Sequence, residues 1–351
     1  MRKLVALDLF SGAGGLSFGL KSAGIDVAMA NEFNSVFCDT YAANHPSTKL
    51  LRSDVRELDF RDEIRNIGLE SVDLVCGGPP CQGFSTVGKK DFHDDRNSLF
   101  REFLRAVRET SPSFVVFENV SGFMTMYGGF AYSALTSELG AMGYNLSSSV
   151  LDIADYGLPQ RRKRTIVLGC RDSVCGIPTP THGKHLTIMD AIGDMPPLAP
   201  GESSDKYLCA PQNEYQSEMR TGTPGLTEHN ASEYGAKMID ILASIPAGGS
   251  LSDLPAHLRP NSAFANTYAR LFPDKPSPTI TRNFGTPSSS RCVHPYWNRA
   301  LSTREGARLQ GFPDRYIFCG GKTSKNLQIG NSVPPILGRV IGEAITSHCS
   351  V

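Results

Sequence analysis

The stretch DLFSGAGGLSFGL, Asp8 to Leu20, decides the fold class of this chain. It ends an apolar segment and opens a helical pattern, and three glycines lie between the two: Gly12, Gly14 and Gly15. Glycines in such a turn let the backbone approach a ligand at the carboxyl end of a parallel sheet. Because Ser17 stands where a dinucleotide fingerprint has its last glycine, the stretch alone fits either a nucleotide-type cofactor site or an ordinary tight turn.

Apolar strands alternate with amphipathic stretches through the first 170 residues. Six segments are typical of strands: LVALDLF from Leu4, DVAMANEF from Asp26, KLLRSDV from Lys49, VDLVCGG from Val72, SFVVFENV from Ser113 and RTIVLGC from Arg164. The segment FREFLRAVRET from Phe100 has the i, i+3, i+4, i+7 apolar spacing of a helix that packs on a sheet. This alternation predicts an α/β fold with a mainly parallel sheet.

The composition changes between about residues 172 and 270, where Pro, Gly, Ser and Asn become frequent and the hydrophobic periodicity is weak. Such a composition indicates a second, loop-rich domain. Regular patterns return in STREGARLQGF from Ser302 and in PPILGRVIGEAITSH, which predicts a final helix beginning at Pro334.

Charges balance over the 351 residues, with 35 Lys and Arg against 35 Asp and Glu, which excludes a uniformly basic coat for nucleic acid. Residues 160–171 nevertheless hold five basic and no acidic side chains, and residues 271–325 hold nine basic and three acidic ones. No apolar run reaches the roughly 18 residues of a membrane helix, so we expect a soluble, cytoplasmic protein. Nine Cys without a CxxC pair predict mostly free thiols and no zinc site.

Two acidic residues, Glu32 and Asp54, follow the second and third predicted strands. The carboxyl ends of parallel strands lie at one edge of a sheet, and an acid after the second strand is typical of a site for the ribose of an adenosine cofactor. A single acid at a strand end is more often a solvated cap. Together with the glycine-rich turn, the two acids favour a cofactor with an adenosine half.

The fourth predicted strand runs into GGPPCQGFS, Gly77 to Ser85. A cysteine is usually a small buried apolar residue, but here glycines and prolines stiffen a turn that holds Cys81 at the ligand-binding edge. The fifth strand brings Glu118 to the same edge, so a thiol and a carboxyl group can share one substrate.

Two polar stretches extend this edge. Residues 82–99 form a long loop whose length favours a lid that closes on substrate. The cluster QRRKR, Gln160 to Arg164, precedes the last strand, and this position favours contact with an anion or a base over a solvated run of charge.

These blocks, in this order, resemble the cytosine-5 DNA methyltransferases of bacterial modification systems over nearly the whole chain. The blocks that carry the resemblance are DLFSGAGG, NEF, Asp54, GGPPCQGFS, FENV, QRRKR, REGARLQGFPD and QIGNSVPP. The resemblance implies an α/β fold with a Rossmann-like S-adenosylmethionine domain and a smaller, loop-rich target-recognition domain. We therefore predict a catalytic and cofactor-binding domain at residues 1–171, a target-recognition domain at 172–298, and a segment at 299–351 that completes the catalytic domain.

The resemblance also assigns catalytic roles. Cys81 matches the nucleophile that attacks carbon 6 of cytosine, and Glu118 matches the acid that contacts N3 and the exocyclic amine. Arg164 matches the residue at O2 of the flipped base, and Arg162 matches its supporting neighbour. A thiolate is needed because carbon 5 of cytosine is a poor nucleophile until a group adds at carbon 6.

The resemblance predicts the remaining contacts as two sets. The S-adenosylmethionine set is Phe10, Ser11, Gly12, Ala13, Gly14, Gly15, Leu16, Glu32, Phe33, Asp54, Val55, Gly78, Pro80, Leu99, Asn331, Ser332 and Val333. The DNA set is Gln82, Ser85, Lys89, Arg96, Arg270, Arg282, Asn283, Ser288, Ser289 and Arg291. We expect S-adenosylhomocysteine as the product and no metal.

The expected partners are duplex DNA and a cognate restriction endonuclease, with a monomeric enzyme in the bacterial cytoplasm or nucleoid and no membrane contact. Two alternatives remain open. One is an RNA cytosine-5 methyltransferase with the same catalytic core, and the other is a DNA-binding regulator that has lost catalysis. The length of the variable region favours DNA, and the presence of both Cys81 and Glu118 argues against a silent binder.

Overall fold

The computed structural model describes residues 2–80, 99–223, 225–260 and 267–349. The chain divides into two compact units. Unit 1 comprises residues 1–153, 163–180 and 333–351, and unit 2 comprises residues 154–162 and 181–332.

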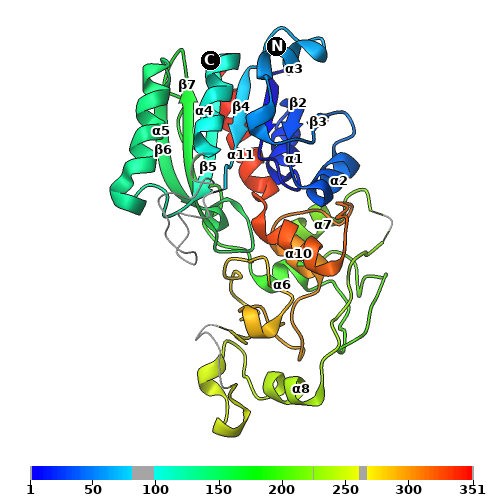
Figure 1. Ribbon diagram of the computed structural model, residues 1–351. Helices are drawn as coiled ribbons and strands as arrows, with labels where there is room; N and C mark the ends of the chain where they lie inside the picture. The colour runs from blue at the N-terminus through cyan, green and yellow to red at the C-terminus, as the bar shows by residue number, and fades with distance from the viewer. Residues whose placement is uncertain (1, 81–98, 224, 261–266, 350–351) are drawn as a thin grey trace. The chain divides into compact units, whose positions relative to one another are not determined.

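Seven strands of the described chain form one sheet in unit 1, in the order β3-β2-β1-β4-β5-β7-β6 (Figure 1). They are β1 (Val5–Leu9), β2 (Asp26–Asn31), β3 (Lys49–Leu51), β4 (Leu74–Gly77), β5 (Phe114–Val120), β6 (Asn145–Asp152) and β7 (Lys163–Cys170). Strands β1 to β5 are parallel, and β7 runs antiparallel between β5 and β6. The predicted mostly parallel, Rossmann-like sheet is confirmed. Strand order reverses beside β1, which is where such sheets bind ligands at their carboxyl edge.

All six predicted segments form strands, but β6 was not predicted. Its sequence NLSSSVLD contains three consecutive serines and lacks the apolar run that marks the buried strands. Most of its residues are only partly buried, because β6 is the edge strand and pairs with β7 alone. Its pairing partner, rather than its own sequence, makes it a strand.

Helices α1 (Gly15–Ser22), α2 (Ser35–Asn44), α3 (Phe60–Asn66), α4 (Leu99–Thr110), α5 (Phe130–Ala141) and α11 (Pro335–His348) complete unit 1. The predicted apolar face of α4 is confirmed, because Phe100, Phe103, Leu104 and Val107 are all buried. They join a core cluster with residues of α3, α5 and the central strands. This apolar interior fixes the strand ends that carry the candidate site.

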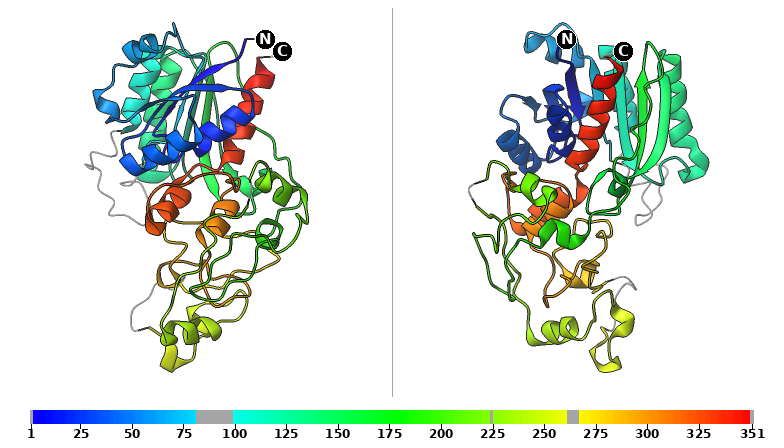
Figure 2. Two further views of the ribbon diagram at one scale, coloured as in Figure 1. Left: turned by 90° about the vertical axis from the view of Figure 1, so that its right-hand side faces the viewer. Right: turned by 180° about the vertical axis from the view of Figure 1, so that it is seen from behind.

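Helices α1 and α11 lie against each other, as Figure 2 shows for the blue and red helices. A Cβ at Gly19 would come within 2.0 Å of the Pro335 carbonyl oxygen, so the two backbones are in direct contact. The final helix begins where the sequence predicts, with Pro334 as its N-cap and a proline in its first turn. The C-terminal helix therefore supports the helix that follows the glycine-rich turn.

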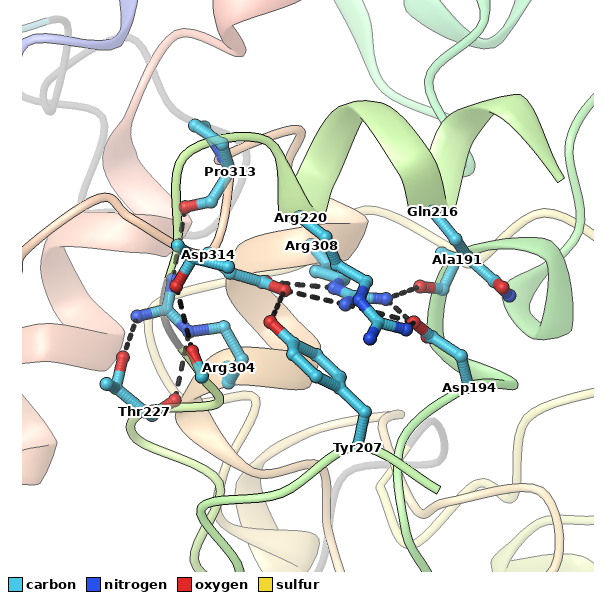
Figure 3. A network of polar contacts seen from close by, with 12 residues as sticks. Ala191, Asp194, Tyr207, Gln216, Arg220, Thr227, Arg304, Arg308, Pro313 and Asp314 are labelled. Carbon is cyan, nitrogen blue, oxygen red and sulfur yellow. Dashed lines mark hydrogen bonds and ion pairs between the residues drawn. The ribbon is translucent and has the colours of Figure 1, made fainter. Parts of the chain in front are cut away.

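Unit 2 has little regular structure. Its helices are α6 (Ile188–Ile192), α7 (Glu214–Arg220), α8 (Ala236–Ala243), α9 (Thr303–Leu309) and α10 (Lys322–Asn331). Arg308 of α9 lies fully buried between the carboxylates of Asp194 and Asp314, at 2.5 and 2.6 Å (Figure 3). Tyr207 donates a hydrogen bond to Asp314 and lies under the guanidinium group of Arg220, which is 3.6 Å from its ring centroid (Figure 3). Polar contacts of this kind hold loops that have no strand partners.

The contact units differ in extent from the predicted domains. Residues 299–332, including α9 and α10, lie in unit 2, whereas the predicted C-terminal segment groups them with the catalytic domain. Only residues 333–351 return to unit 1. The assignment of functions to the three predicted parts stays a prediction. Among the helices of the described residues, none has the length and apolar character needed to cross a membrane.

Candidate active site

The turn between β1 and α1 has an unusual backbone. Phe10, Gly12 and Gly14 all have positive φ angles, of 56°, 57° and 89°. Such angles are common for glycine but rare for a bulky residue such as Phe10, so the surrounding structure must enforce this conformation. The Ser11 N–H donates to the Asn31 carbonyl, which ties the turn to the end of β2. The turn is therefore specified by its neighbours and is more than a loose connection.

The carboxylate of Glu32 organises this turn. It accepts hydrogen bonds from the backbone N–H groups of Gly12 at 2.9 Å, Phe33 at 2.9 Å and Asn34 at 2.7 Å. Burial raises the pKa of Glu32 above its ordinary value, although these three donors favour the charged form. Glu32 thus joins the end of β2 to the glycine-rich turn.

The adjacent residues along this edge are Phe33 and Asp54. The ring of Phe33 is 74% exposed, a large apolar surface left open at the end of β2. Asp54 caps a short helical turn and pairs with Arg56, and a hydrogen bond from Arg56 lowers the pKa of the Asp54 carboxyl group. The side-chain amide of Asn31 donates to the Leu51 and Ser53 carbonyls and so links the ends of β2 and β3.

The turn after β4 lies directly against Glu118. A Cβ at Gly78 would stand 2.6 Å from Glu118 Oε2, so a larger residue would displace the carboxylate. The Asn119 side chain donates to the Pro79 carbonyl at 3.2 Å and fixes the turn to the end of β5. Asn119 lies within the block FENV but is not among the residues predicted for the site from the sequence.

Glu118 and Arg164 form an ion pair, with Arg164 Nε 2.8 Å from Glu118 Oε1. Their side chains are 10% and 15% exposed, so the pair is largely screened from water. The antiparallel register of β5 and β7 places Arg164 opposite Val120, two residues beyond Glu118, where its side chain reaches back to the carboxylate. The two residues predicted to contact the base are thus paired with each other.

Arg162 is predicted as the supporting neighbour of Arg164 among the catalytic residues. Its side chain is 1% exposed, and its guanidinium group donates to the carbonyls of Ile280, Gly330 and Ser332 in unit 2. A guanidinium group bound to backbone carbonyls is compatible with a supporting role. That role stays a prediction.

The predicted DNA-facing residues of unit 2 divide into two groups. Five are exposed in the loop after residue 280: Arg282, Asn283, Ser288, Ser289 and Arg291. Arg270 is different and corrects the prediction, because it is buried and donates to the carbonyls of Leu242, Ile245, His294 and Trp297. It also bonds the Asn298 side chain. Its charge holds loops together and is not presented to DNA.

The C-terminal residues predicted for the cofactor are distributed over the two units. Asn331 is exposed and Ser332 is buried, and both belong to unit 2, whereas Val333 belongs to unit 1. The Ser332 hydroxyl donates to the Gln328 carbonyl at 2.7 Å. Leu99 is partly buried at the start of α4.

Several predicted residues lie outside the described residues. These are Cys81, Gln82, Ser85, Lys89 and Arg96, together with all of the predicted lid except its last residue, Leu99. Within the described part of the chain, no group of three His, Cys, Asp or Glu side chains is arranged to hold a metal ion.

Comparisons with known proteins agree with this architecture. The family model of C-5 cytosine-specific DNA methylases matches residues 4–347. The Type II methyltransferase M1.HphI of Haemophilus parahaemolyticus is 38% identical over 97% of this chain and 86% of its own length. The Type II methyltransferase M.DdeI of Desulfomicrobium norvegicum is 34% identical over 97% of this chain and 88% of its own length. The crystal structure of a putative DNA modification methyltransferase encoded within an Escherichia coli prophage has a TM-score of 0.82, with 27% identity over 99% of this chain and all of that one.

Fold and site define a Rossmann-like methyltransferase. The chain belongs to the family of C-5 cytosine-specific DNA methylases. It is a DNA cytosine-5 methyltransferase that uses S-adenosylmethionine, as the resemblance implied.

Proposed function

We propose that the enzyme methylates one cytosine within a specific duplex DNA sequence and that Cys81, Glu118 and Arg164 act directly on the flipped base. The observation that carries this proposal is the Glu118–Arg164 ion pair. It lies at the end of β5, against the Gly78 turn, and Cys81 follows that turn three residues later in the chain. A carboxyl, a guanidinium and a thiol in this order are the groups that activation of cytosine requires.

Each residue has a balanced part in the reaction. The Cys81 thiolate adds to carbon 6, and the Glu118 carboxylate, after it takes up a proton from water, gives that proton to N3, so the electron pair of the 5,6 double bond becomes available at carbon 5. Arg164 donates hydrogen bonds to O2 and keeps the Glu118 carboxyl group in place. S-adenosylmethionine, when bound, supplies an electrophilic methyl group. After methylation a base removes the proton at carbon 5, the thiolate leaves carbon 6, and the N3 proton returns to Glu118.

The cofactor edge of unit 1 fits an adenosine cofactor. Nothing lies within 4 Å of a Cβ position at Gly12, so the turn leaves open space for a ligand. The exposed ring of Phe33 offers a stacking surface for adenine. The carboxylate oxygens of Glu32 keep further acceptor capacity beyond their three backbone donors, which suits ribose hydroxyl groups. The other predicted cofactor residues remain part of this proposal.

DNA recognition and biological setting follow from the relatives. We assign sequence reading to the exposed loop with Arg282, Asn283, Ser288, Ser289 and Arg291, because guanidinium and amide groups pair with base edges in the major groove. M1.HphI and M.DdeI are named Type II methyltransferases, which supports a role in a restriction–modification system with a cognate endonuclease. The enzyme would act as a monomer on DNA in the bacterial cytoplasm.

Covalent trapping tests the assigned chemistry. Duplex DNA with 5-fluorocytosine has no proton to lose at carbon 5, so the wild-type enzyme should remain bound to it after methyl transfer. Mass spectrometry should place the adduct on the peptide that contains Cys81. Cys81→Ser should form no adduct, and Glu118→Gln should form it slowly, by a factor of about 10²–10⁴ typical of lost general acid catalysis.

The control variant is Cys349→Ser, which removes an exposed thiol far along the chain and should trap normally. An adduct on any other cysteine, or full turnover by Cys81→Ser, would refute the mechanism. Counting tritiated methyl groups on duplex DNA and on transfer RNA in parallel separates the DNA enzyme from the RNA alternative, since incorporation into RNA alone contradicts the proposal.

A further inference from the structure

Two buried side chains of unit 2 form hydrogen bonds to the backbone of one residue, Ile280. They belong to Gln160 and Arg162, which are two residues apart in an extended segment and are 0% and 1% exposed. The Gln160 amide oxygen accepts from the Ile280 N–H at 2.9 Å, and Arg162 donates to the Ile280 carbonyl at 3.2 Å. Both polar backbone atoms of Ile280 are thus held by side chains that lie more than a hundred residues away in sequence. We call Gln160 and Arg162 the clip.

The same extended segment also runs beside the residues that lead to Ile280. Gln160 forms a parallel bridge with Ser277, whose N–H donates to the Pro159 carbonyl and whose carbonyl accepts from the Arg161 N–H at 2.7 Å. The Thr279 hydroxyl donates to the Arg161 carbonyl at 2.8 Å. Residues 277–280 are therefore fixed along their length, as a strand is fixed by its neighbour.

The chain leaves this anchor and becomes exposed within two residues, at Arg282 and Asn283. Its departure is also constrained, because a Cβ at Gly330 would lie 2.4 Å from the Arg282 backbone nitrogen. The backbone of the loop therefore rests on α10 with no space between them. The exposed side chains of Arg282 and Asn283 begin at this point of contact.

The clip has a second attachment at the end of α10. Arg162 donates to the carbonyls of Gly330 and Ser332, and the latter also accepts from the Gln310 side chain at 2.7 Å. Gln160 donates to the Leu309 carbonyl and to the Gln310 amide oxygen. The anchor of the loop is thus joined to α9 and α10 through fully buried polar groups, and each such group is costly to leave without its partner.

We propose that Gln160 and Arg162 are positioning residues for sequence specificity: they hold Ile280 so that Arg282 and Asn283 meet the DNA in one conformation. The proposal rests on the role of Arg282 and Asn283 under the proposed function. Neither clip residue touches DNA; each acts through the loop. Arg and Asn recognise a base through two parallel hydrogen bonds, and a small displacement of the side chain breaks them. A loop whose backbone is fixed therefore discriminates between bases better than a loop that can shift.

The test uses a randomised library of duplex DNA, methylated by the full-length enzyme and read by bisulfite sequencing. The readout is the specificity ratio, the rate at the preferred sequence divided by the rate at its single-base variants. Gln160→Met, which keeps the side-chain length without hydrogen-bonding groups, and Arg162→Lys, which keeps the charge without the planar fork, should each lower this ratio about tenfold, the scale of one base contact. Rates at non-preferred sequences should stay near those of the wild type.

Arg304→Lys is the matched control for folding. Arg304 is as buried as Arg162 and also donates to backbone carbonyls of unit 2, but these are the carbonyls of Thr227, Pro313 and Tyr316, which lie outside residues 277–283. This variant should lose stability without a change in the specificity ratio. An equal loss of specificity in Arg304→Lys and in both clip variants would mean that general loosening is the cause, and it would overturn the proposal.

A double-mutant cycle separates this proposal from the function on which it rests. In the Arg282→Ala, Asn283→Ala background, Gln160→Met should change the ratio no further, because its effect passes through those two residues. If the loop variant alone keeps the wild-type ratio, the assignment of the loop to base reading fails, and the clip proposal fails with it. If the loop variant loses specificity while both clip variants keep it, the clip proposal alone is overturned.

Discussion

The interiors of the two units of this enzyme are stabilised by different kinds of side chain. The largest fully buried side chains of unit 1 are aromatic, among them Phe60, Phe103, Phe117 and Phe123. Those of unit 2 include four arginines: Arg162, Arg299, Arg304 and Arg308. Unit 1 satisfies its backbone through strand ladders and packs apolar side chains between the layers, whereas unit 2 has loops whose carbonyl groups need donors from elsewhere.

Buried guanidinium groups supply those donors. Arg270 binds four backbone carbonyls, and Arg304 binds three, so one side chain joins several segments that are distant in sequence. The difference teaches that a unit with little regular structure can keep its loops in fixed positions without a regular sheet. It also predicts that the two units respond differently to mutation, to pH and to added volume.

Truncation of a central side chain should produce the largest effect. Arg308→Met leaves the buried carboxylates of Asp194 and Asp314 without their common partner, and we expect a loss of about 3–5 kcal/mol in the free energy of unfolding. Phe117→Ala in unit 1 should cost about the same, because it creates a cavity in the apolar core. Urea unfolding followed by circular dichroism measures both losses.

A second substitution distinguishes the loss of an ion-pair partner from the loss of apolar packing. Asp314→Asn added to Arg308→Met removes one unpaired charge and should recover part of the stability, since an uncompensated buried charge causes much of the loss. No polar exchange should repair Phe117→Ala. If Arg308→Met alone unfolds at the wild-type urea concentration, the network of Figure 3 does not stabilise unit 2.

Acidification should destabilise unit 2 before unit 1. Burial lowers the pKa of His294 to about 3, so the unfolded chain takes up a proton below the ordinary value of 6.5 while the folded unit does not. Burial alone would raise the pKa of Glu305, but the ion pair with Arg299 outweighs it and holds the pKa well below its usual range. Stability of unit 2 therefore falls as the pH drops below 6.5 and falls further below 4.5, by about 1.4 kcal/mol per pH unit for each proton taken up on unfolding.

Unit 1 contains two groups with opposing responses. Burial lowers the pKa of His45 to about 3, which costs stability in acid, but burial raises the pKa of Asp8 to about 7. Folded Asp8 keeps its proton up to about pH 7, whereas the unfolded side chain loses it above 3.8, so acidification over that range stabilises the folded state. The two effects oppose each other, and unit 1 should change little between pH 6.5 and 4.5.

Hydrogen exchange with mass spectrometry, corrected for intrinsic rates, measures each unit separately. Peptides of unit 2 should lose protection at pH 4.5 while those of the central strands keep it. Asp8→Asn should remove the compensation, so that unit 1 then loses protection in acid as well. Earlier opening of unit 1 in the wild-type protein would contradict this account.

Added volume should give the smallest of these effects and should depend on the unit. Gly19→Ala in α1 pushes a methyl group against the backbone of α11, and overpacking of this kind costs about 1–3 kcal/mol. Gly183→Ala in a loop of unit 2 meets nothing within 4 Å and should be neutral or stabilise by about 0.4–1 kcal/mol, because alanine restricts the unfolded chain. Thermal unfolding midpoints rank the two variants. An equal midpoint for both would contradict the expectation that unit 1 is more tightly packed at Gly19 than unit 2 is at Gly183.

The sequence predicted the sheet of unit 1 better than it predicted the contacts of unit 2. Apolar runs and the glycine-rich turn predicted six strands and the sheet edge with Glu32 and Glu118. A buried strand consists largely of apolar residues, so its own sequence identifies it. β6 was missed because its pairing with β7 makes it a strand. The prediction that Arg270 contacts DNA is wrong because the sequence does not distinguish a loop arginine that faces solvent from one that binds backbone carbonyls.

The same limit applies to Gln160 and Arg162. The block QRRKR was recognised, but only the structure separates Arg164, which reaches Glu118, from Arg162, which reaches the backbone of Ile280. Arg162 and Arg164 are two residues apart, and alternation along an extended segment would place both side chains on the same side. Their different partners are therefore not visible in the spacing of the sequence.

Bisulfite sequencing of DNA from cells that express the enzyme tests the central claim most directly. The account predicts protected cytosines confined to one sequence context in wild-type cells and no protection above background with Cys81→Ser. Absence of protected cytosines in the wild type, or the same protection in both strains, would contradict it.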